Sequence, residues 1–574
     1  MFNYYFQKEL GHLKEIGVAF ARENPAIAPM LGEPSADPDV DRLLEGVAFL
    51  TGSIRQKIDD EFPEIIHNFI RQVWPHYLRP LPATTLMAFA HQEGTDSVAY
   101  VPSGVEVDSV AVDGTACRFR TCTDVVLPPV SVVRAGYEET PDGTAGIRVT
   151  LGLTAQDDWD ADNLRFYLGG GYAEASDLYH LLLTGVRRVV VGTGSSPHGA
   201  VLGPDCLKPK GFSEEEALIP WPSTSFDGYR LLQEYFVLPD KFLFVELTGL
   251  SAWGERKSGE EVDLWFELTT APEVPLRVDA SRFMLSVAPA VNVFSHSADP
   301  VLISPEKNEY RVRPTAPDVS HYQVFSLSGV SAYMAGSGEV RPMKPFHSLA
   351  IDESDVVYSE ILTKSPVRDA MDVSISIATP GGRAMPDFKS LSFDVLCTNG
   401  FLPEQLHSGD IRVATTRSPE GISFRNIRKP TSAVLPPLGT NALWPLISMM
   451  NLNQFCLTRL ENLKAMLALF LLDGQGGRRV FASSEKRIEG IVGLEADQAS
   501  RLFRGVMVSG VIFRIAMRKD HFAGMGDLYL FAAVLDRFLG LSAALNTFTQ
   551  LVVTEIGTGE IFTWQERMGE RLLG

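Results

Sequence analysis

The spacing of apolar residues changes near residue 83, and this change constrains the fold more than any other feature of the chain. Before it, apolar residues recur every three or four positions, which is the period of an α-helix. After it, they alternate with polar residues, which is the period of a β-strand. The sequence therefore predicts an α+β multidomain fold that begins with a helical region, residues 1–82.

Three apolar stripes predict three helices in this region. Asp37 can cap the second helix, with Pro38 at its first position. The third helix begins near Pro63 and ends at Pro75, since proline cannot continue a helix. The stripes are Phe6, Leu10, Leu13, Gly17 and Phe20, then Leu43, Val47, Leu50, Ile54 and Ile58, then Phe62, Ile66, Phe69 and Val73.

Residues 83–425 predict a β-rich middle region of antiparallel, half-buried strands. Apolar residues at 147, 149, 151 and 153 alternate with Arg148, Thr150 and Gly152. The valine pairs at 105/107 and 110/112 precede Asp113-Gly114, which is the signal of a β-hairpin. A short helix is expected around 176–185. We expect two subdomains here, with the break near 225–260.

Residues 426–574 predict a mixed α/β C-terminal domain. The segment 443–472 indicates two helices, and the alternation of Val511, Phe513, Ile515 and Met517 indicates a strand. Apolar residues from Leu528 to Leu545 predict one long helix that ends near 548–551.

The net charge of −20 limits the classes of partner. Nucleic acids and anionic membranes need a basic surface, so neither is expected as the main partner. Apolar runs stay shorter than the roughly 18–20 residues of a membrane span, and the N-terminus lacks the features of a signal peptide. Five cysteines, an odd number, favour a reducing compartment. We therefore expect a cytoplasmic protein without direct membrane insertion.

The densest cluster of polar chemistry is the stretch DDEFPEIIHNFIRQVWPHYLRPLP, residues 59–82. Its acids stand where a helix begins, where they match the helix dipole. His67 and His76 are nine positions apart, with helix-perturbing features between or beside them, which does not suit shared metal coordination. Arg79 can pair with one of the acids. We interpret the stretch as architecture, a rigid aromatic exit from a helix.

Other motifs are weaker. Gly169-Gly170-Gly171 resembles a phosphate-binding loop but lacks the Lys-Ser/Thr pair that would follow it. The acidic run 157–163 leaves an alternative open, a β-rich carbohydrate-binding or carbohydrate-active protein with Asp158, Asp160 and Asp162 as acid and base, or a weak calcium site. A secreted binding module is a third class. We predict no catalytic, cofactor or metal residue and no enzymatic activity.

Several segments, taken in order, resemble the TssF family, a baseplate subunit of the bacterial type VI secretion system. The resemblance runs from residue 4 to the last few residues. It departs from the family pattern at one place: the segment that resembles PVVN-F is preceded by SVA, where a Cys-Thr pair is expected. The segments are YYFQKELGHLKEIGVAFARENPAIAPMLG, SADPDVDRLLEGVAFL, DDEFPE, PHYLRP, LLQEYFVLPDKFLFVELTGL, APAVNVF, NEYRV, FDVLCTNGFLPEQL and LFAAVLDRFLGLSAALNTFTQL.

The resemblance implies a structural role similar to that of contractile-phage baseplate wedge proteins. It implies two copies of this chain with one TssG in each wedge, and six wedges around the spike hub (VgrG). TssK would join the wedge to the inner-membrane complex, and TssE would join it to the sheath. No cofactor is implied.

The aromatic-rich N-terminus predicts where partners bind, because an isolated helix with aromatic residues on several sides is poorly soluble. We predict that residues 1–80 contribute to a helical bundle between subunits; the alternative is that they cover the chain's own sheets. The predicted interface residues are Phe2, Tyr5, Phe6, Leu10, Leu13, Trp74 and Tyr77.

Overall fold

The structure is a computed structural model of the 574-residue chain. It describes residues 6–7, 10–14, 16, 20, 39, 42–52 and 67–71, and most of the chain from 74 to 569. Within that last stretch it leaves out 93–97, 155–161, 194–199, 220, 223–224, 254–260, 273–276, 305, 308, 337, 347, 349–350, 353–354, 366–367, 380–384, 439–455, 473–476 and 504.

A curved six-stranded sheet in the order β25-β3-β4-β15-β1-β26 encloses a hydrophobic cluster of its own, which includes Phe89, Phe119 and Phe424. Asp113 and Gly114 both have positive φ and join β3 to β4, as the hairpin signal predicted. The strands are β1 (Thr84–His91), β3 (Glu106–Val112), β4 (Thr115–Thr121), β15 (Val287–Val291), β25 (Ile411–Ala414) and β26 (Ile422–Asn426).

Two further sheets are built mainly from residues 130–284, in the orders β10-β9-β13-β7-β6 and β11-β12-β8-β14. In β7 the apolar residues of the predicted alternation are buried. The strands are β6 (Val130–Glu139), β7 (Ala145–Leu153), β8 (Asn163–Leu168), β9 (Val186–Thr193), β10 (Ala200–Leu202), β11 (Leu207–Lys210), β12 (Phe244–Thr248), β13 (Glu261–Leu268) and β14 (Phe283–Met284).

Residues 294–398 form another pair of sheets, in the orders β16-β24-β19-β20, with β17 beside β24, and β18-β23-β22-β21. A separate two-stranded sheet joins β2 (Ala99–Val101) to β5 (Val125–Leu127). The strands of the pair are β16 (Phe294–Ser297), β17 (Val301–Leu302), β18 (Glu309–Arg311), β19 (Gln323–Met334), β20 (Val340–Pro342), β21 (Lys344–Pro345), β22 (Val357–Lys364), β23 (Met371–Ala378) and β24 (Phe388–Thr398).

The C-terminal sheet has the order β27-β28-β29-β30, with β31 beside β29. β27 and β28 form a long antiparallel hairpin, whereas β28 and β29 run parallel and are joined through helix α8. The elements are β27 (Ile491–Phe503), β28 (Val506–Met517), α8 (Met525–Ser542), β29 (Thr547–Glu555), β30 (Ile561–Thr563) and β31 (Arg567–Met568).

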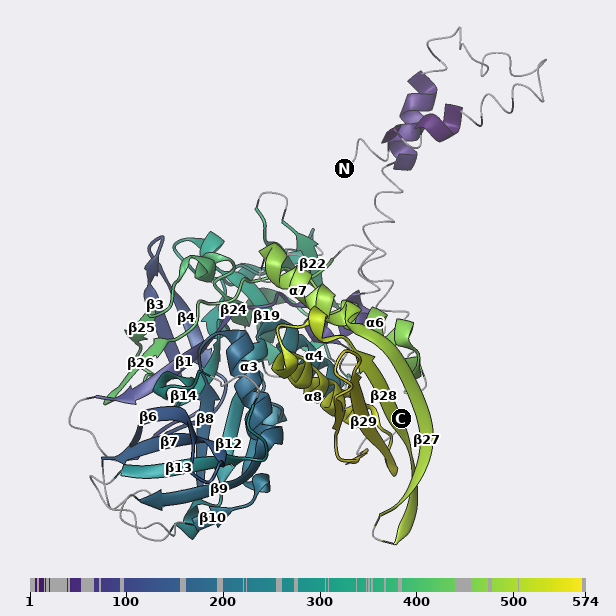
Figure 1. Ribbon diagram of the computed structural model, residues 1–574. Coiled ribbons are helices and arrows are strands. Elements are labelled where there is room, and N and C mark those ends of the chain that lie inside the picture. Colours follow the sequence, from purple (N-terminus) through teal and green to yellow (C-terminus); the bar gives the residue numbers. More distant parts are fainter. Residues whose placement is uncertain are drawn as a thin grey trace.

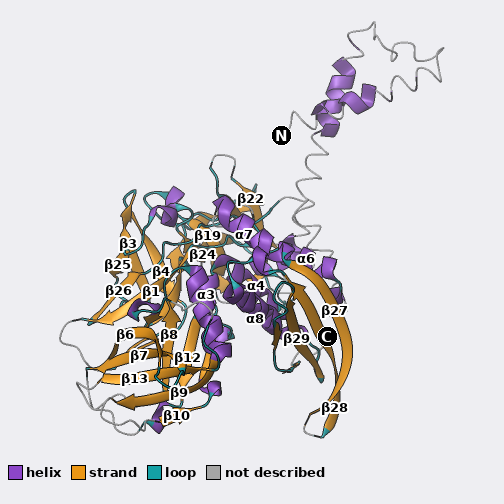
Figure 2. Ribbon diagram, viewed as in Figure 1, coloured by secondary structure: helices purple, strands orange, loops and turns teal. Residues whose placement is uncertain are grey.

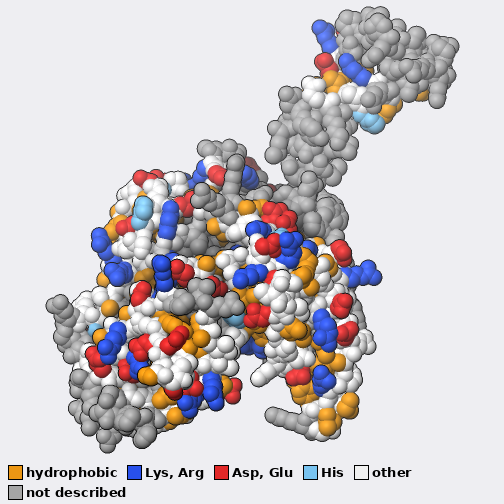
Figure 3. Space-filling view, in the orientation of Figure 1, with side chains coloured by type: hydrophobic (Ala, Val, Ile, Leu, Met, Phe, Trp, Pro, Cys, Tyr) orange, Lys and Arg blue, Asp and Glu red, His pale blue; other side chains and the backbone are white. Residues whose placement is uncertain are grey.

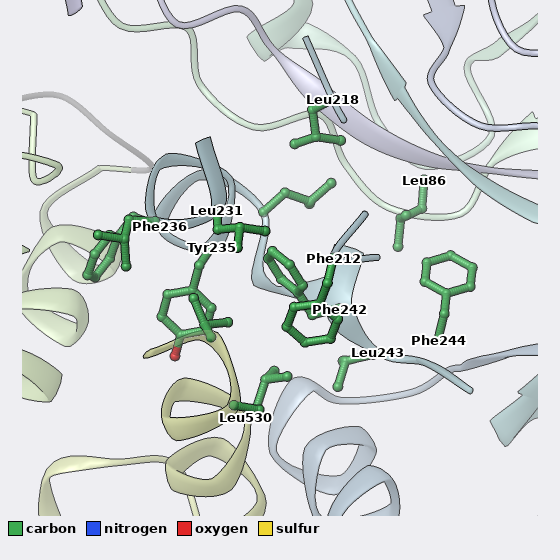
Figure 4. Packing of buried hydrophobic residues seen from close by; sticks show 14 of the residues in the cluster. Leu86, Phe212, Leu218, Leu231, Tyr235, Phe236, Phe242, Leu243, Phe244 and Leu530 are labelled. Carbon is green, nitrogen blue, oxygen red and sulfur yellow. The ribbon is translucent and has the colours of Figure 1, made fainter. Parts of the chain in front are cut away.

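Helices lie between the middle sheets and the C-terminal sheet (Figures 1 and 2). Helix α8 packs against α3 (Tyr172–His180) and α4 (Asp227–Val237), and α6 (Leu460–Ala468) and α7 (Gly477–Glu489) lie above it. Figure 4 shows the core beside α4, where Tyr235 faces Leu530 of α8, with Phe242 and Phe212 close by. One hydrophobic cluster therefore extends from the middle region into the C-terminal region.

The carboxylate of Asp527 joins four of these helices. Asp527 is fully buried at the start of α8 and accepts hydrogen bonds from the Tyr172 hydroxyl (2.7 Å), the Tyr235 hydroxyl (3.4 Å) and the Arg487 Nε atom (3.0 Å). Burial raises the pKa of both tyrosines, so both hydroxyls keep the proton that they donate. The backbone N–H of Ala523 donates a further hydrogen bond, at 2.9 Å.

A close backbone contact holds α8 beside α3. A Cβ atom added at Gly526 would lie 2.1 Å from the carbonyl carbon and oxygen of Ser176, so only glycine fits at this position. The N–H of Gly526 donates to the carboxylate of Asp177 at 2.8 Å. The start of α8 is thus fixed to α3 by both shape and hydrogen bonding.

The predicted α+β fold class is confirmed. The strand around 511–517 and the short helix around 176–185 are present, the latter beginning earlier, at Tyr172.

The long C-terminal helix was predicted to end near 548–551, which is wrong: α8 ends at Ser542, because Ala543 turns to an extended conformation and 548–551 lie in β29. Of the two helices expected in 443–472, α6 is the second, and most of the first lies outside the described residues. The domain boundaries near 82 and 425 stay predictions.

We expect Asp527→Asn to lower the free energy of unfolding by about 3–5 kcal/mol, because it leaves the buried Arg487 guanidinium without a counter-charge. Chemical denaturation of the full chain measures this. Asp520→Asn is the matched control, because Asp520 is exposed and pairs with Arg518 at the surface, where ion pairs contribute about 0–1 kcal/mol. Equal effects of the two substitutions would contradict the role of Asp527.

We also expect stability to fall in acid. Burial between Tyr529 and Phe562 lowers the pKa of His180 to about 4, from 6.5. Between these two values the unfolded chain binds a proton that the folded chain does not, so stability is complete above pH 6.5 and decreases as the pH falls toward 4, by at most about 1.4 kcal/mol per pH unit. His180→Phe should reduce this loss, measured as the apparent unfolding midpoint at pH 7 and pH 5. The exposed His407→Phe is the control and should not.

Candidate partner interface

The predicted interface residues fall into three groups. Phe2 and Tyr5 lie outside the described residues. Phe6, Leu10 and Leu13 are half-buried helical residues near the N-terminus. Trp74 and Tyr77 are buried in the chain's own core, where they stabilise the fold of this chain and present little surface to a partner. A residue that contacts a partner needs exposed side-chain surface, and Trp74 and Tyr77 have almost none in this chain.

The helix at 42–52 exposes its apolar stripe. Leu43, Val47 and Leu50 are 70%, 45% and 63% exposed, and their spacing of four and three residues places them on one face of the helix. Ile16, in the preceding helical segment, is also about half exposed. The described helices of both segments lie away from the sheets (Figure 1). The apolar face that the sequence predicts for the helix at 42–52 is thus exposed among the described residues of the single chain.

Burial of this stripe against a partner chain would contribute substantial free energy to binding. A valine or leucine side chain contributes about 1.5–3 kcal/mol when it passes from full exposure to burial. An amphipathic helix that docks its apolar face uses anchors at this i, i+4, i+7 spacing. The helix at 42–52 is therefore the described element best suited to a helical bundle with other chains.

An aromatic joint connects this helical region to the body. Trp74 stacks on Tyr229 of α4, with ring centroids 4.6 Å apart, and lies 4.9 Å from Phe470, just after α6. His76 stacks on Trp221 at 4.1 Å, and the Arg79 guanidinium lies 5.3 Å from the centre of the Phe325 ring. The joint therefore packs against elements from the middle and C-terminal regions.

Arg71, in the helical segment just before the joint, makes polar contacts with β22. The Arg71 Nε atom lies 3.8 Å from the carboxylate of Glu360, and Arg71 also donates to the Glu360 carbonyl oxygen. Burial, together with the nearby Arg71 charge, lowers the pKa of His67 to about 4, so His67 is neutral at pH 7. These contacts agree with the interpretation of residues 59–82 as architecture; the acids at 59–64 lie outside the described residues.

The weaker motifs take part in local structure. The carboxylate of Asp162 accepts a hydrogen bond from the backbone N–H of Ser251 at 2.9 Å, while Asp158 and Asp160 lie outside the described residues. In the glycine triplet, the carbonyl oxygen of Gly170 accepts a hydrogen bond from Arg428 at 2.7 Å. Within the part of the chain that the structure describes, no three His, Cys, Asp or Glu residues are grouped to hold a metal ion.

A family model described as "Type VI secretion system, TssF" matches residues 1–571. The chain belongs to the TssF family. It is thereby a component of the type VI secretion baseplate, as the sequence resemblance predicted. Each described helix is too short or too polar to cross a bilayer.

A curated TssF relative and two solved structures agree with this membership. Type VI secretion system component TssF1 of Pseudomonas aeruginosa is 30% identical, over 99% of this chain and 98% of the relative. A chain of the TssK-TssF-TssG baseplate subcomplex, solved by cryo-electron microscopy, matches 93% of this chain and all of its own length, with a TM-score of 0.76 and 27% identity. A chain of the type VI secretion baseplate complex matches over the full length of both chains, with a TM-score of 0.64 and 26% identity.

Proposed function

We propose that this chain is a structural, non-catalytic wedge subunit that assembles with TssG and TssK. Its TssF relatives occur in a TssK-TssF-TssG subcomplex. The observation that supports the proposal is the exposed apolar stripe at Leu43, Val47 and Leu50, because exposed apolar side chains on one helix face mark a protein–protein contact. We propose Phe2, Tyr5, Phe6, Leu10 and Leu13 as further residues that contact a partner.

The finer parts of the proposal follow the family resemblance. Two copies of this chain would share one TssG, with TssE linking the wedge to the sheath and six wedges surrounding the spike hub. Through TssK, the assembly would dock on the inner-membrane complex from the cytoplasm. Numerous interfaces of modest strength suit an assembly that must hold and then rearrange.

The test is to co-express this chain, carrying the only tag, with the TssG and TssK of its own system and to measure the mass of the complex. The triple variant Leu43→Ser, Val47→Ser, Leu50→Ser should reduce the recovery of TssG at least tenfold, because it removes the apolar anchors. The matched control, Arg42→Ser with Glu45→Ser, changes exposed polar residues of the same helix and should leave recovery unchanged.

Two results would count against the proposal. A monomer that co-purifies with neither partner would contradict the wedge function. Full recovery of TssG with the triple variant would contradict the interface and leave the wedge function standing. Circular dichroism of each variant separates loss of binding from loss of folding.

A further inference from the structure

The outer edge of β27 is open. This 13-residue strand ends the C-terminal sheet and, among the described strands, pairs only with β28 (Figure 1). Edge strands usually carry proline or lysine, or are short, which prevents pairing with other chains. The β27 sequence IVGLEADQASRLF has no proline or lysine and is long; its protective features are three charged side chains, Glu495, Asp497 and Arg501, and an irregular register between Ile491 and Gly493. Away from the end that α6 contacts, the backbone N–H and C=O groups on this edge are therefore not paired with any described strand.

The hairpin tip also exposes apolar side chains. β29 begins at Thr547, opposite Ser509, so residues 501–508 extend beyond it as a two-stranded ribbon. Leu502, Val506 and Met507 in this ribbon are 68%, 64% and 65% exposed. Figure 3 shows hydrophobic side chains gathered at the lower end of the hairpin. Exposed apolar groups beside an open strand edge mark a protein–protein contact.

We propose that β27 pairs with β27 of a second copy of this chain, antiparallel, about a two-fold axis at Gln498. This inference deepens the proposed function, because it assigns a surface to the contact between two copies. In this register Glu495 of each copy lies opposite Arg501 of the other, and Leu494 lies opposite Leu502. Opposite residues of an antiparallel pair share a face, so both pairs contact directly.

Charge and apolar burial together favour this register. An axis at Ala499 would also pair Asp497 with Arg501, but it would leave Leu502 opposite the small Ala496. An axis at Asp497 would place this acid opposite itself, and an axis at Ala496 would place Glu495 opposite Asp497. Like charges directly opposite each other destabilise a strand pair. The axis at Gln498 instead forms two opposite-charge pairs and covers both exposed Leu502 side chains. Arg501 contacts Glu566 of its own chain at 3.5 Å and is half exposed, so it remains accessible to a second acid.

Charge reversal tests the pairing in the complex with TssG and TssK. Glu495→Arg and Arg501→Glu should each lower the share of two-copy complexes at least fivefold, measured by light scattering. The double variant restores both ion pairs and should recover the native share. Glu560→Arg reverses an exposed acid in the turn between β29 and β30, outside β27, and should have no effect.

Cross-linking provides a second readout that does not depend on charge. The variant Gln498→Cys places a thiol of each copy at the two-fold axis and should form a disulfide-linked dimer in the oxidised complex. The exposed Leu302→Cys, on β17, should not.

The β27 pairing would be overturned if both charge-reversal variants kept the native share of two-copy complexes and Gln498→Cys formed no disulfide-linked dimer. The wedge function would then still stand. A complex with a single copy of this chain would overturn the two-copy proposal and the pairing together.

Discussion

The buried carboxylate of Asp527 is the contact on which the arrangement of the regions depends. It accepts hydrogen bonds from α3, α4 and α7 while it starts α8, so residues hundreds of positions apart meet at one side chain. A buried charge is tolerated only when it is paired and fully hydrogen-bonded, and each donor is therefore required. Gly526, next to it, permits the close approach of α8 to α3. The C-terminal sheet is consequently fixed to the middle region.

A second buried network strengthens α4 from within. Arg230 donates to Glu234 at 3.0 Å and to the carbonyl oxygen of Phe212, while Glu234 also accepts from the N–H of Leu218 and from Lys241. These contacts join the helix to the chain before and after it. Buried hydrogen bonds thus join the segments around α4, whereas the helix at 42–52 presents its apolar stripe to solvent. The chain thus has a well-packed hydrophobic core of its own, together with exposed apolar surfaces that would be buried only in an assembly.

Sequence patterns predicted much of the fold where periodicity was strong. Alternation at 147–153 and 511–517 marked strands, and Asp113-Gly114 marked a turn that needs positive φ at both positions. β27 and α7 were not foreseen, because β27 lacks clear alternation and α7 is mostly polar. Thr549, Leu551 and Val553 do alternate, and this signal would have shown that a strand follows α8.

The interface was harder to predict than the fold. An apolar helical stripe has the same spacing whether it covers the chain's own sheet or another chain, so sequence left that choice open. Trp74 and Tyr77 illustrate the difficulty: their aromatic character suggested a partner-facing surface, but both are buried, and Trp74 packs on Tyr229 and Phe470 of distant segments. Only three-dimensional contacts distinguish the two cases.

The aromatic joint at residues 74–79 has a mechanical consequence. Stacked rings are close-packed and resist compression, so they transmit displacement rather than absorb it. A displacement of the helical residues 67–71, to which Trp74 is hydrogen-bonded through Ile70, would reach α4 through Tyr229 and the chain after α6 through Phe470. Because one indole ring contacts both α4 and the chain after α6, such a displacement would act on the middle and C-terminal regions at the same time.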